Sequence, residues 1–146
     1  MATTKTTTTE TARIIIVSTV FAAALTWAWF HGYVQFILDG DKSFVSYGII
    51  FVLAASLAAA IAGKRNHIRD AAAACTAIGF AGTLIGITIG LSGVDVAALT
   101  TPEGVIQAGT SLFGGIATAF CSTITGAFAA LWLACVGSCV GVGAWS

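Results

Sequence analysis

The side chains of this chain that could handle an ion in an apolar setting are hydroxyl groups in two glycine-rich segments. The segments read AAAACTAIGFAGTLIGITIGLSG at 71–93 and GTSLFGGIATAFCSTITGAFAALWLA at 109–134. Thr83 lies next to the midpoint of the first segment, and Thr123 lies next to the midpoint of the second. If the segments are antiparallel helices, both hydroxyls fall at a similar depth. Hydroxyls donate and accept hydrogen bonds, so the pair predicts the lining of a path for a proton or another small cation.

Small residues in the same segments predict close helix packing. Membrane helices associate through glycine and alanine, which let their backbones approach. The small residues that recur along one face of each segment are Gly82, Gly86 and Gly90 in the first and Gly115, Ala119 and Gly126 in the second. The hydroxyls also have a plainer interpretation, because a threonine in a helix can bond the carbonyl one turn back. Both interpretations apply to Ser111, Thr118 and Thr125, which recur every seven residues.

Groups that would support enzymatic chemistry are missing from the apolar segments. No aspartate, glutamate, lysine or arginine lies deep within any of them, so a proton relay would need its titrating group from another chain. The sequence has no nucleophile–base arrangement, phosphate loop or cofactor motif, and we predict neither an enzyme nor a bound cofactor. Cys135 and Cys139 share a helix face, but their spacing matches no standard zinc pattern, and no metal site is expected.

The composition is that of an integral membrane protein. The 146 residues are 58% hydrophobic and 8% charged, with a mean hydropathy of +0.97. Soluble domains carry about a quarter charged residues, so this chain cannot cover a surface that faces water, and the lipid bilayer is its expected surrounding. The net charge is zero and there is no basic cluster with stacking aromatics, which excludes nucleic acid as a partner.

Four apolar segments must position the hydroxyl groups. They run from about 13–38, 44–63, 71–93 and 107–140, and each reaches the roughly 20 residues that a transmembrane helix needs. Short connections make consecutive helices antiparallel neighbours. The sequence predicts an all-α protein with a disordered polar tail at 1–12 and a single four-helix transmembrane domain at 13–146. The last segment is longer than one crossing requires, so it tilts, extends beyond the bilayer or breaks near VGSCVGVG.

The basic residues predict the orientation of these helices. Lysine and arginine collect on the cytoplasmic side of membrane proteins. Lys5 and Arg13 stand before or at the start of the first segment. Between the second and third segments stand Lys64, Arg65 and Arg69. The other side carries Lys42 beside two aspartates, and the loop with Asp95 and Glu103. We therefore predict a multi-pass protein of the cytoplasmic (inner) membrane with both termini in the cytoplasm.

The two threonine segments resemble the MotA/TolQ/ExbB proton-channel family. The penultimate membrane helix of that family carries a Gly-Thr-hydrophobic-x-Gly core, which here is Gly82-Thr83-Leu84-Ile85-Gly86. Its last helix starts with Gly-Ile-Ala, followed by a threonine eight residues after that glycine and a glycine three residues further on. The matching residues here are Gly115-Ile116-Ala117, Thr123 and Gly126. The match covers about 65 of the 146 residues.

The resemblance implies a function and a set of partners. This chain would be a minimal member of the family, because only KRNHIRD stands where relatives carry a large cytoplasmic domain. It would form a homo-oligomeric ring, usually of five subunits, around the transmembrane helix of a single-span ExbD- or MotB-like protein that supplies an aspartate. Thr83 and Thr123 would line the channel, and the proton-motive force would move the partner.

Two other functions fit the composition. A holin-like pore former that assembles with itself would share the small size, the apolarity and the lack of charged relay groups. A structural subunit of a larger membrane complex would need only the helix-packing residues. The sequence distinguishes neither the transported ion, proton or sodium, nor the process that it would drive.

Overall fold

Helices account for nearly all of the computed structural model, which describes residues 2–41, 43–64 and 66–139. The elements are α1 (Ala2–Phe30), α2 (Tyr33–Gly40), α3 (Val45–Ile61), α4 (Ile68–Ser92), a 3-10 turn η1 (Ala97–Thr100) and α5 (Pro102–Cys139). None of the residues in these described ranges belongs to a β-strand. The all-α prediction is confirmed for this part of the chain.

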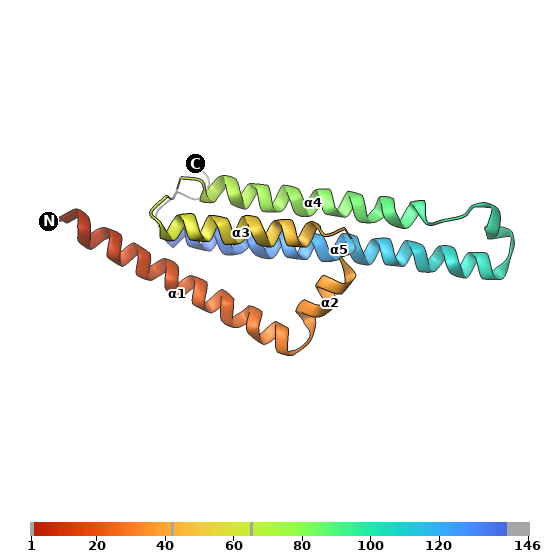
Figure 1. Cartoon of the computed structure of the whole chain (residues 1–146), viewed down its shortest axis with the longest axis horizontal. Helices are drawn as coiled ribbons and strands as arrows, with labels where there is room; N and C mark the ends of the chain where they lie inside the picture. Colours follow the sequence, from red (N-terminus) through yellow and green to blue (C-terminus); the bar gives the residue numbers. More distant parts are fainter. Residues whose placement is uncertain (1, 42, 65, 140–146) are drawn as a thin grey trace.

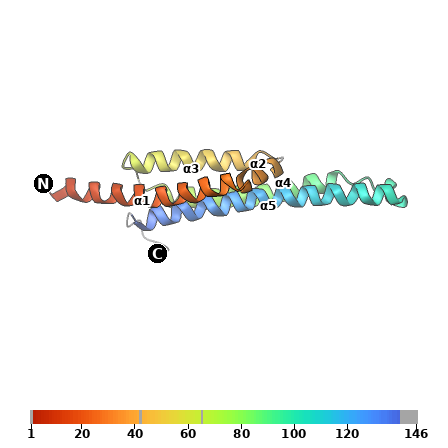
Figure 2. The same cartoon turned by 90° about the horizontal axis from the view of Figure 1, so that it is seen from below.

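The long antiparallel pair of α4 and α5 is the centre of the fold (Figure 1). Helix α3 lies along the half of this hairpin that holds the end of α5 (Figures 1 and 2). Helix α1 lies on the side of α3 and α5 that faces away from α4 (Figure 1). Helix α1 diverges from the other helices toward Phe30, and α2 leads the chain back to α5 (Figure 1). The α4–α5 hairpin is therefore the element that every other helix packs against.

Within the part of the chain that the structure describes, three helices are long and apolar enough to cross a membrane. They are Thr11–Phe30 within α1, Ile68–Ser92 and Pro102–Cys139. Helix α3 is also apolar but has only 17 residues, which makes it about 25 Å long. The lengths and composition of the three longer helices are consistent with a location in a membrane.

The first apolar segment is broken, contrary to the prediction of one helix over 13–38. Helix α1 ends at Phe30, and α2 begins at Tyr33. Between them Gly32 has φ of 79°, in the left-handed region that side chains other than glycine rarely adopt. The rings of Trp27, His31 and Tyr33 cluster at this turn, with the His31 centroid 4.3 Å from that of Trp27 and 6.3 Å from that of Tyr33, and the Trp27 and Tyr33 centroids 6.1 Å apart. One glycine thus turns the chain inside the segment that was predicted to be a single helix.

The N-terminal end differs from the predicted disordered tail at 1–12. Helix α1 already begins at Ala2 and continues through the threonine-rich stretch. The physical reason is that helix growth is easier than helix initiation: once the apolar part of α1 provides a nucleus, each further residue adds a hydrogen bond. The prediction from composition considers only that this stretch lacks a hydrophobic face, so it does not include the extension of the helix.

The other predicted boundaries shift by a few residues. The second segment becomes α3 at Val45–Ile61, and the third becomes α4 at Ile68–Ser92. Helix α5 starts earlier than predicted, at Pro102, because proline suits the first turn of a helix, where its missing N–H has no partner to lose. It is continuous to Cys139, and the remainder of the VGSCVGVG run lies outside the described residues.

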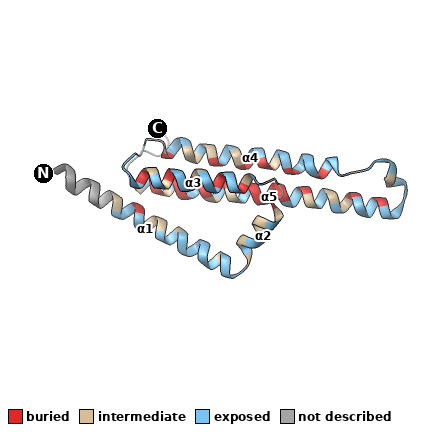
Figure 3. Ribbon diagram, viewed as in Figure 1, coloured by how far each residue is buried: buried red, intermediate tan, exposed pale blue. Residues whose placement is uncertain are grey.

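The apolar core gathers where α1, α3, α4 and α5 run together, away from the far tip of the hairpin (Figure 3). The ring of Phe21 in α1 stacks on Trp132 of α5 with centroids 5.3 Å apart, and the Trp132 indole donates to Ser18 Oγ at 3.4 Å. The buried members of this core are Ile14, Ile49, Leu53, Ala60, Ile68, Cys75, Ala129, Trp132, Leu133 and Val136. These contacts hold α1 and α3 on the hairpin.

Candidate functional site

The α4–α5 seam brings backbone against backbone. A Cβ atom added to Gly86 would lie 2.6 Å from the Ala119 nitrogen, and one added to Gly126 would lie 2.8 Å from the Cys75 carbonyl oxygen. A Cβ on Gly82 would lie 2.6 Å from Ser122 Cβ. Since real Cβ atoms essentially never approach below 3.0 Å, these glycines determine how close the helices come.

Gly90 and Gly115 extend the same seam toward the tip of the hairpin. A Cβ on Gly90 would lie 3.0 Å from the Gly115 Cα, and one on Gly115 would lie 2.6 Å from the Gly86 carbonyl oxygen. Ala119 is 4% exposed, and its backbone is what a Cβ atom on Gly86 would contact. All six small residues predicted for packing therefore lie in the contact between α4 and α5.

This close contact places the two threonine hydroxyls side by side. Thr83 Oγ1 and Thr123 Oγ1 form a hydrogen bond across the seam. Thr83 Oγ1 also lies 3.2 Å from the Gly79 carbonyl oxygen, and Thr123 Oγ1 lies 3.0 Å from that of Ala119. The two hydroxyls are thus at the same height along the hairpin, as antiparallel packing of the two segments requires.

Hydrogen-bonding capacity remains at this pair. Each hydroxyl has one donor and two acceptor lone pairs. If one hydroxyl donates to the other and the second donates to a backbone carbonyl, both donors are used but most lone pairs are free. The pair can therefore accept a hydrogen bond from a protonated carboxyl or a water molecule, or supply two oxygen ligands to a cation.

An exposed apolar surface surrounds the threonine pair. On the same helix faces, at spacings of three, four and seven residues, stand the exposed side chains Phe80, Ile87, Ile116 and Phe120. We call these four residues with Thr83 and Thr123 the threonine face.

The other helices of the chain pack on the opposite side of α5. Thr118 Oγ1 donates to the Gly40 carbonyl at 2.9 Å, and Ser46 Oγ donates to Thr125 Oγ1 at 3.3 Å. Thr118 and Thr125 are five residues before and two residues after Thr123, so they point away from it on a helix of 3.6 residues per turn. Helices α2 and α3 therefore leave the threonine face uncovered.

The hydroxyl row at seven-residue spacing has a structural role. Ser111 Oγ donates to the Gly90 carbonyl at 3.1 Å, which joins α5 to α4. Thr118 and Thr125 join α5 to α2 and α3 through the bonds given above. Thr118 and Thr125 also bond the carbonyl one turn back, that of Gly114 at 3.1 Å and that of Cys121 at 2.9 Å. The structure therefore confirms the plainer interpretation for these two hydroxyls and adds contacts with neighbouring helices.

Asp41 is a buried carboxylate that sequence reasoning did not single out. It is 3% exposed. Its Oδ1 accepts hydrogen bonds from Ser43 N at 3.0 Å and Ser43 Oγ at 2.5 Å, and its Oδ2 accepts one from Ser46 N at 2.7 Å. Burial raises the pKa of Asp41, and these hydrogen bonds outweigh burial, so its pKa lies below the ordinary value.

The sequence did hold a signal for this arrangement. Aspartate and serine shortly before an apolar run are typical of the start of a helix, where their oxygens bind free N–H groups. The signal predicts a cap for α3. It does not predict that Gly40 and Asp41 would be covered by the middle of α5, because that follows from tertiary packing.

The remaining predicted groups lie apart from the threonine pair. The thiols of Cys75 and Cys121 are buried, and those of Cys135 and Cys139 are half-buried. The described part of the chain contains no group of three or more histidine, cysteine or acidic side chains that could hold a metal ion. Asp95 Oδ1 accepts a hydrogen bond from Ala97 N at 3.0 Å in the α4–α5 connection.

Comparison with known proteins found no match. No family model, curated protein or solved structure matches this chain. The likeness to the MotA/TolQ/ExbB family thus stays a prediction that rests on the two threonine–glycine segments.

Proposed function

We propose that this chain is a subunit of an ion-driven membrane complex, in which several copies surround the transmembrane helix of a partner and pass protons or another small cation along the threonine face. The observation that carries the proposal is the hydrogen-bonded pair of Thr83 and Thr123 on a surface that no other helix among the described residues covers. The complex would work in the cytoplasmic membrane and use the proton-motive force.

The chemistry of the pair favours an acidic partner. The hydroxyls have free acceptor lone pairs, while the threonine face supplies no group that titrates near neutral pH. A protonated carboxyl on the partner helix would donate a hydrogen bond to a threonine oxygen, and after moving away it would release its proton to water. Ionisable groups inside membranes commonly mark such proton paths. A single-span partner with one aspartate fits this requirement.

The packing of α4 and α5 supports a ring. A fixed hydroxyl geometry needs a rigid support, and the backbone contacts of Gly86 and Gly126 provide one. Repeating the hairpin around an axis would turn the threonine face of each copy toward a common centre. Closed rings of identical subunits are a common form of protein assembly, and the family resemblance favours five copies.

The experiment that tests the proposal measures ion flux in cells that contain the natural partner. Valine has nearly the shape of threonine but no hydroxyl, so Thr83→Val with Thr123→Val removes the hydroxyls and keeps the volume. We expect partner-dependent proton flux to fall at least tenfold. Serine at both positions keeps the hydroxyls and should restore most of the flux at equal protein abundance.

Other results would contradict the proposal in different ways. Unchanged flux in the double valine variant would refute a role for the hydroxyls. Collapse of the membrane potential when this chain alone is expressed would indicate a pore former that assembles with itself. Loss of protein abundance in both the valine and the serine variants, without any measurable flux in the natural chain, would indicate a structural subunit.

A further inference from the structure

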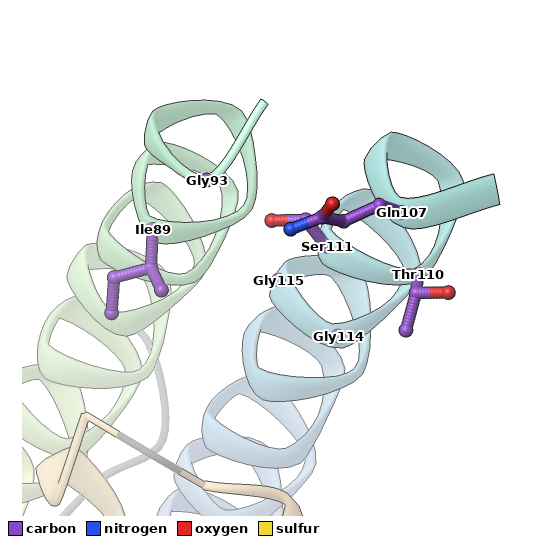
Figure 4. Close-up of a pocket in the computed structure, with 7 residues that line it drawn as sticks. All are labelled: Ile89, Gly93, Gln107, Thr110, Ser111, Gly114 and Gly115. Atoms are coloured by element: carbon purple, nitrogen blue, oxygen red, sulfur yellow. The ribbon is translucent and has the colours of Figure 1, made fainter. Parts of the chain in front are cut away.

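Pockets of different character lie toward the two ends of α5. Near the tip of the hairpin, the polar side chains of Gln107 and Ser111 point into a gap between α4 and α5 (Figure 4). Toward the other end of α5, a pocket of about 490 Å³ lies between that helix and α1. Its lining comes from four residues of α1 within 16–21 and four residues of α5 within 134–139. We call this second pocket the α1–α5 groove.

The lining of the α1–α5 groove is suited to a hydrocarbon. All four residues that α1 contributes have hydrocarbon side chains. The two cysteines that α5 contributes behave as small apolar groups. The remaining hydroxyl, Ser138 Oγ, donates to the Ala134 carbonyl at 2.9 Å within its own helix. A polar ligand would therefore find few hydrogen-bond partners in this groove, whereas an apolar ligand would be surrounded by side chains like itself.

The α1–α5 groove is too narrow for another helix. The six residues of each helix between the ends of its lining extend over roughly 9 Å. Spread over that length, a volume of about 490 Å³ corresponds to a cross-section of about 50 Å². A helix with side chains is about 10–12 Å wide, which gives a cross-section of roughly 80–110 Å². A lipid acyl chain is thinner than a helix and fits this space better.

A positive charge stands at one end of the groove. Arg13 is exposed and precedes the groove residues Ile16 and Val20 by three and seven positions, so it lies on the same face of α1. An apolar span that begins at Thr11 would place Arg13 at the level of the lipid head groups, with the groove roughly 5–12 Å deeper along the helix. Basic residues at this level attract anionic lipids.

We propose that the α1–α5 groove binds an acyl chain of an anionic phospholipid whose phosphate pairs with Arg13. Lipid tails are as apolar as leucine, so the groove alone gains little by exchanging one lipid for another. Selection therefore depends on the head group, and one arginine near the membrane surface favours an anionic over a zwitterionic lipid by about fivefold. This inference rests on a location in a membrane and does not depend on the proposed function of the threonine face.

The experiment measures how lipids with brominated acyl chains quench the fluorescence of Trp132. The Trp132 ring stacks on that of Phe21 with centroids 5.3 Å apart, and Phe21 lines the groove, so a bromine in the groove lies close to this indole. Trp27, Trp29 and Trp145 are replaced by phenylalanine, and the full chain is reconstituted in phosphatidylcholine bilayers at low salt. Titration with brominated phosphatidylglycerol or brominated phosphatidylcholine then gives the relative binding constant of the two lipids.

Arg13→Gln tests the role of the head group. We expect the chain with Arg13 to prefer phosphatidylglycerol about fivefold and Arg13→Gln to bind the two lipids about equally. Arg69→Gln removes the same charge from another exposed arginine and should keep the preference. Equal binding of the two lipids by the chain with Arg13 would overturn the proposal. An equal loss of preference in both arginine variants would also overturn it, because the selection would then come from the overall charge.

A second pair of variants keeps the test valid if Arg13→Gln does not fold. Ala134→Phe places a ring in the groove, and Ala81→Phe adds the same ring at an exposed position of α4. Ala134→Phe should abolish the preference of Trp132 quenching for phosphatidylglycerol, and Ala81→Phe should retain it. A full preference in Ala134→Phe would place the bound lipid elsewhere and refute the proposal. Absence of quenching by either lipid in the chain with Ala134 would also refute it, because something other than lipid would then fill the groove.

Discussion

Adding one methyl group at Gly115 should separate α4 from α5, whereas the same change at the preceding residue should not. A Cβ on Gly115 would lie 2.6 Å from the Gly86 carbonyl oxygen and 2.6 Å from the Gly90 nitrogen. Ordinary contacts begin at 3.4 Å, so Gly115→Ala forces the backbones apart by most of an ångström. A Cβ on Gly114 would have no atom within 4 Å, so Gly114→Ala meets open space.

The expected energies follow from these contacts. Overpacking a close contact costs about 1–3 kcal/mol, and alanine in place of glycine inside a helix gains about 0.5–1 kcal/mol. Gly115→Ala should therefore destabilise the chain by up to about 2.5 kcal/mol, and Gly114→Ala should stabilise it by about 0.5–1 kcal/mol. Because the helix-forming gain is common to both variants, their difference of about 1–3 kcal/mol isolates the contact between the helices.

The assay is unfolding of the purified chain in mixed micelles with a rising fraction of sodium dodecyl sulfate, followed by tryptophan fluorescence. Trp132 is buried against α1 and should report the loss of helix packing. Gly115→Ala should unfold at a lower detergent fraction than the natural chain, and Gly114→Ala at an equal or higher fraction. Equal midpoints for the two variants would refute the backbone contact between α4 and α5.

Two further predictions concern the chain before α3. Hydrogen bonds lower the pKa of Asp41 below its ordinary value of 3.8, so its stabilising effect is complete above pH 3.8 and is lost as the pH falls through the lowered pKa. Thermal unfolding should therefore show that Asp41→Asn is less stable than the natural chain at pH 6 and that this difference narrows as the pH falls below 3.8; a constant difference would contradict the bonding described. Gly32 has φ of 79°, so Gly32→Ala should cost about 1–2 kcal/mol, whereas Gly48→Ala, in open space within α3, should stabilise the chain. Thermal unfolding of both variants measures this, and equal stabilities would argue against the turn at Gly32.

Features with a strong local pattern could be predicted from the sequence. The glycines of 71–93 recur every four residues, and this spacing alone places Gly82, Gly86 and Gly90 on one helix face. The positions of Thr83 and Thr123 near the segment midpoints predicted that they would lie at a similar height, and the hydrogen bond between them agrees with this. Length and hydropathy also sufficed to identify the apolar helices.

Features that depend on one backbone angle or on tertiary packing could not be predicted. The turn between α1 and α2 depends on the left-handed conformation of Gly32, and glycine also occurs inside continuous helices such as α4 and α5. The burial of Asp41 depends on contact between Gly40 and Thr118, which are 78 residues apart. Helix α5 also extends beyond the α2–α3 connection. Pro102 precedes Thr118, which contacts that connection, by 16 residues, or roughly 24 Å along the helix.

The most direct test of the proposed ion-driven complex is the native mass of the assembly after gentle extraction from the membranes of its natural host. The proposal predicts a defined ring of about five copies that carries fewer copies of a single-span protein with an aspartate in its apolar helix. A large homo-oligomer of variable size, or a defined complex in which no such single-span protein is present, would contradict it.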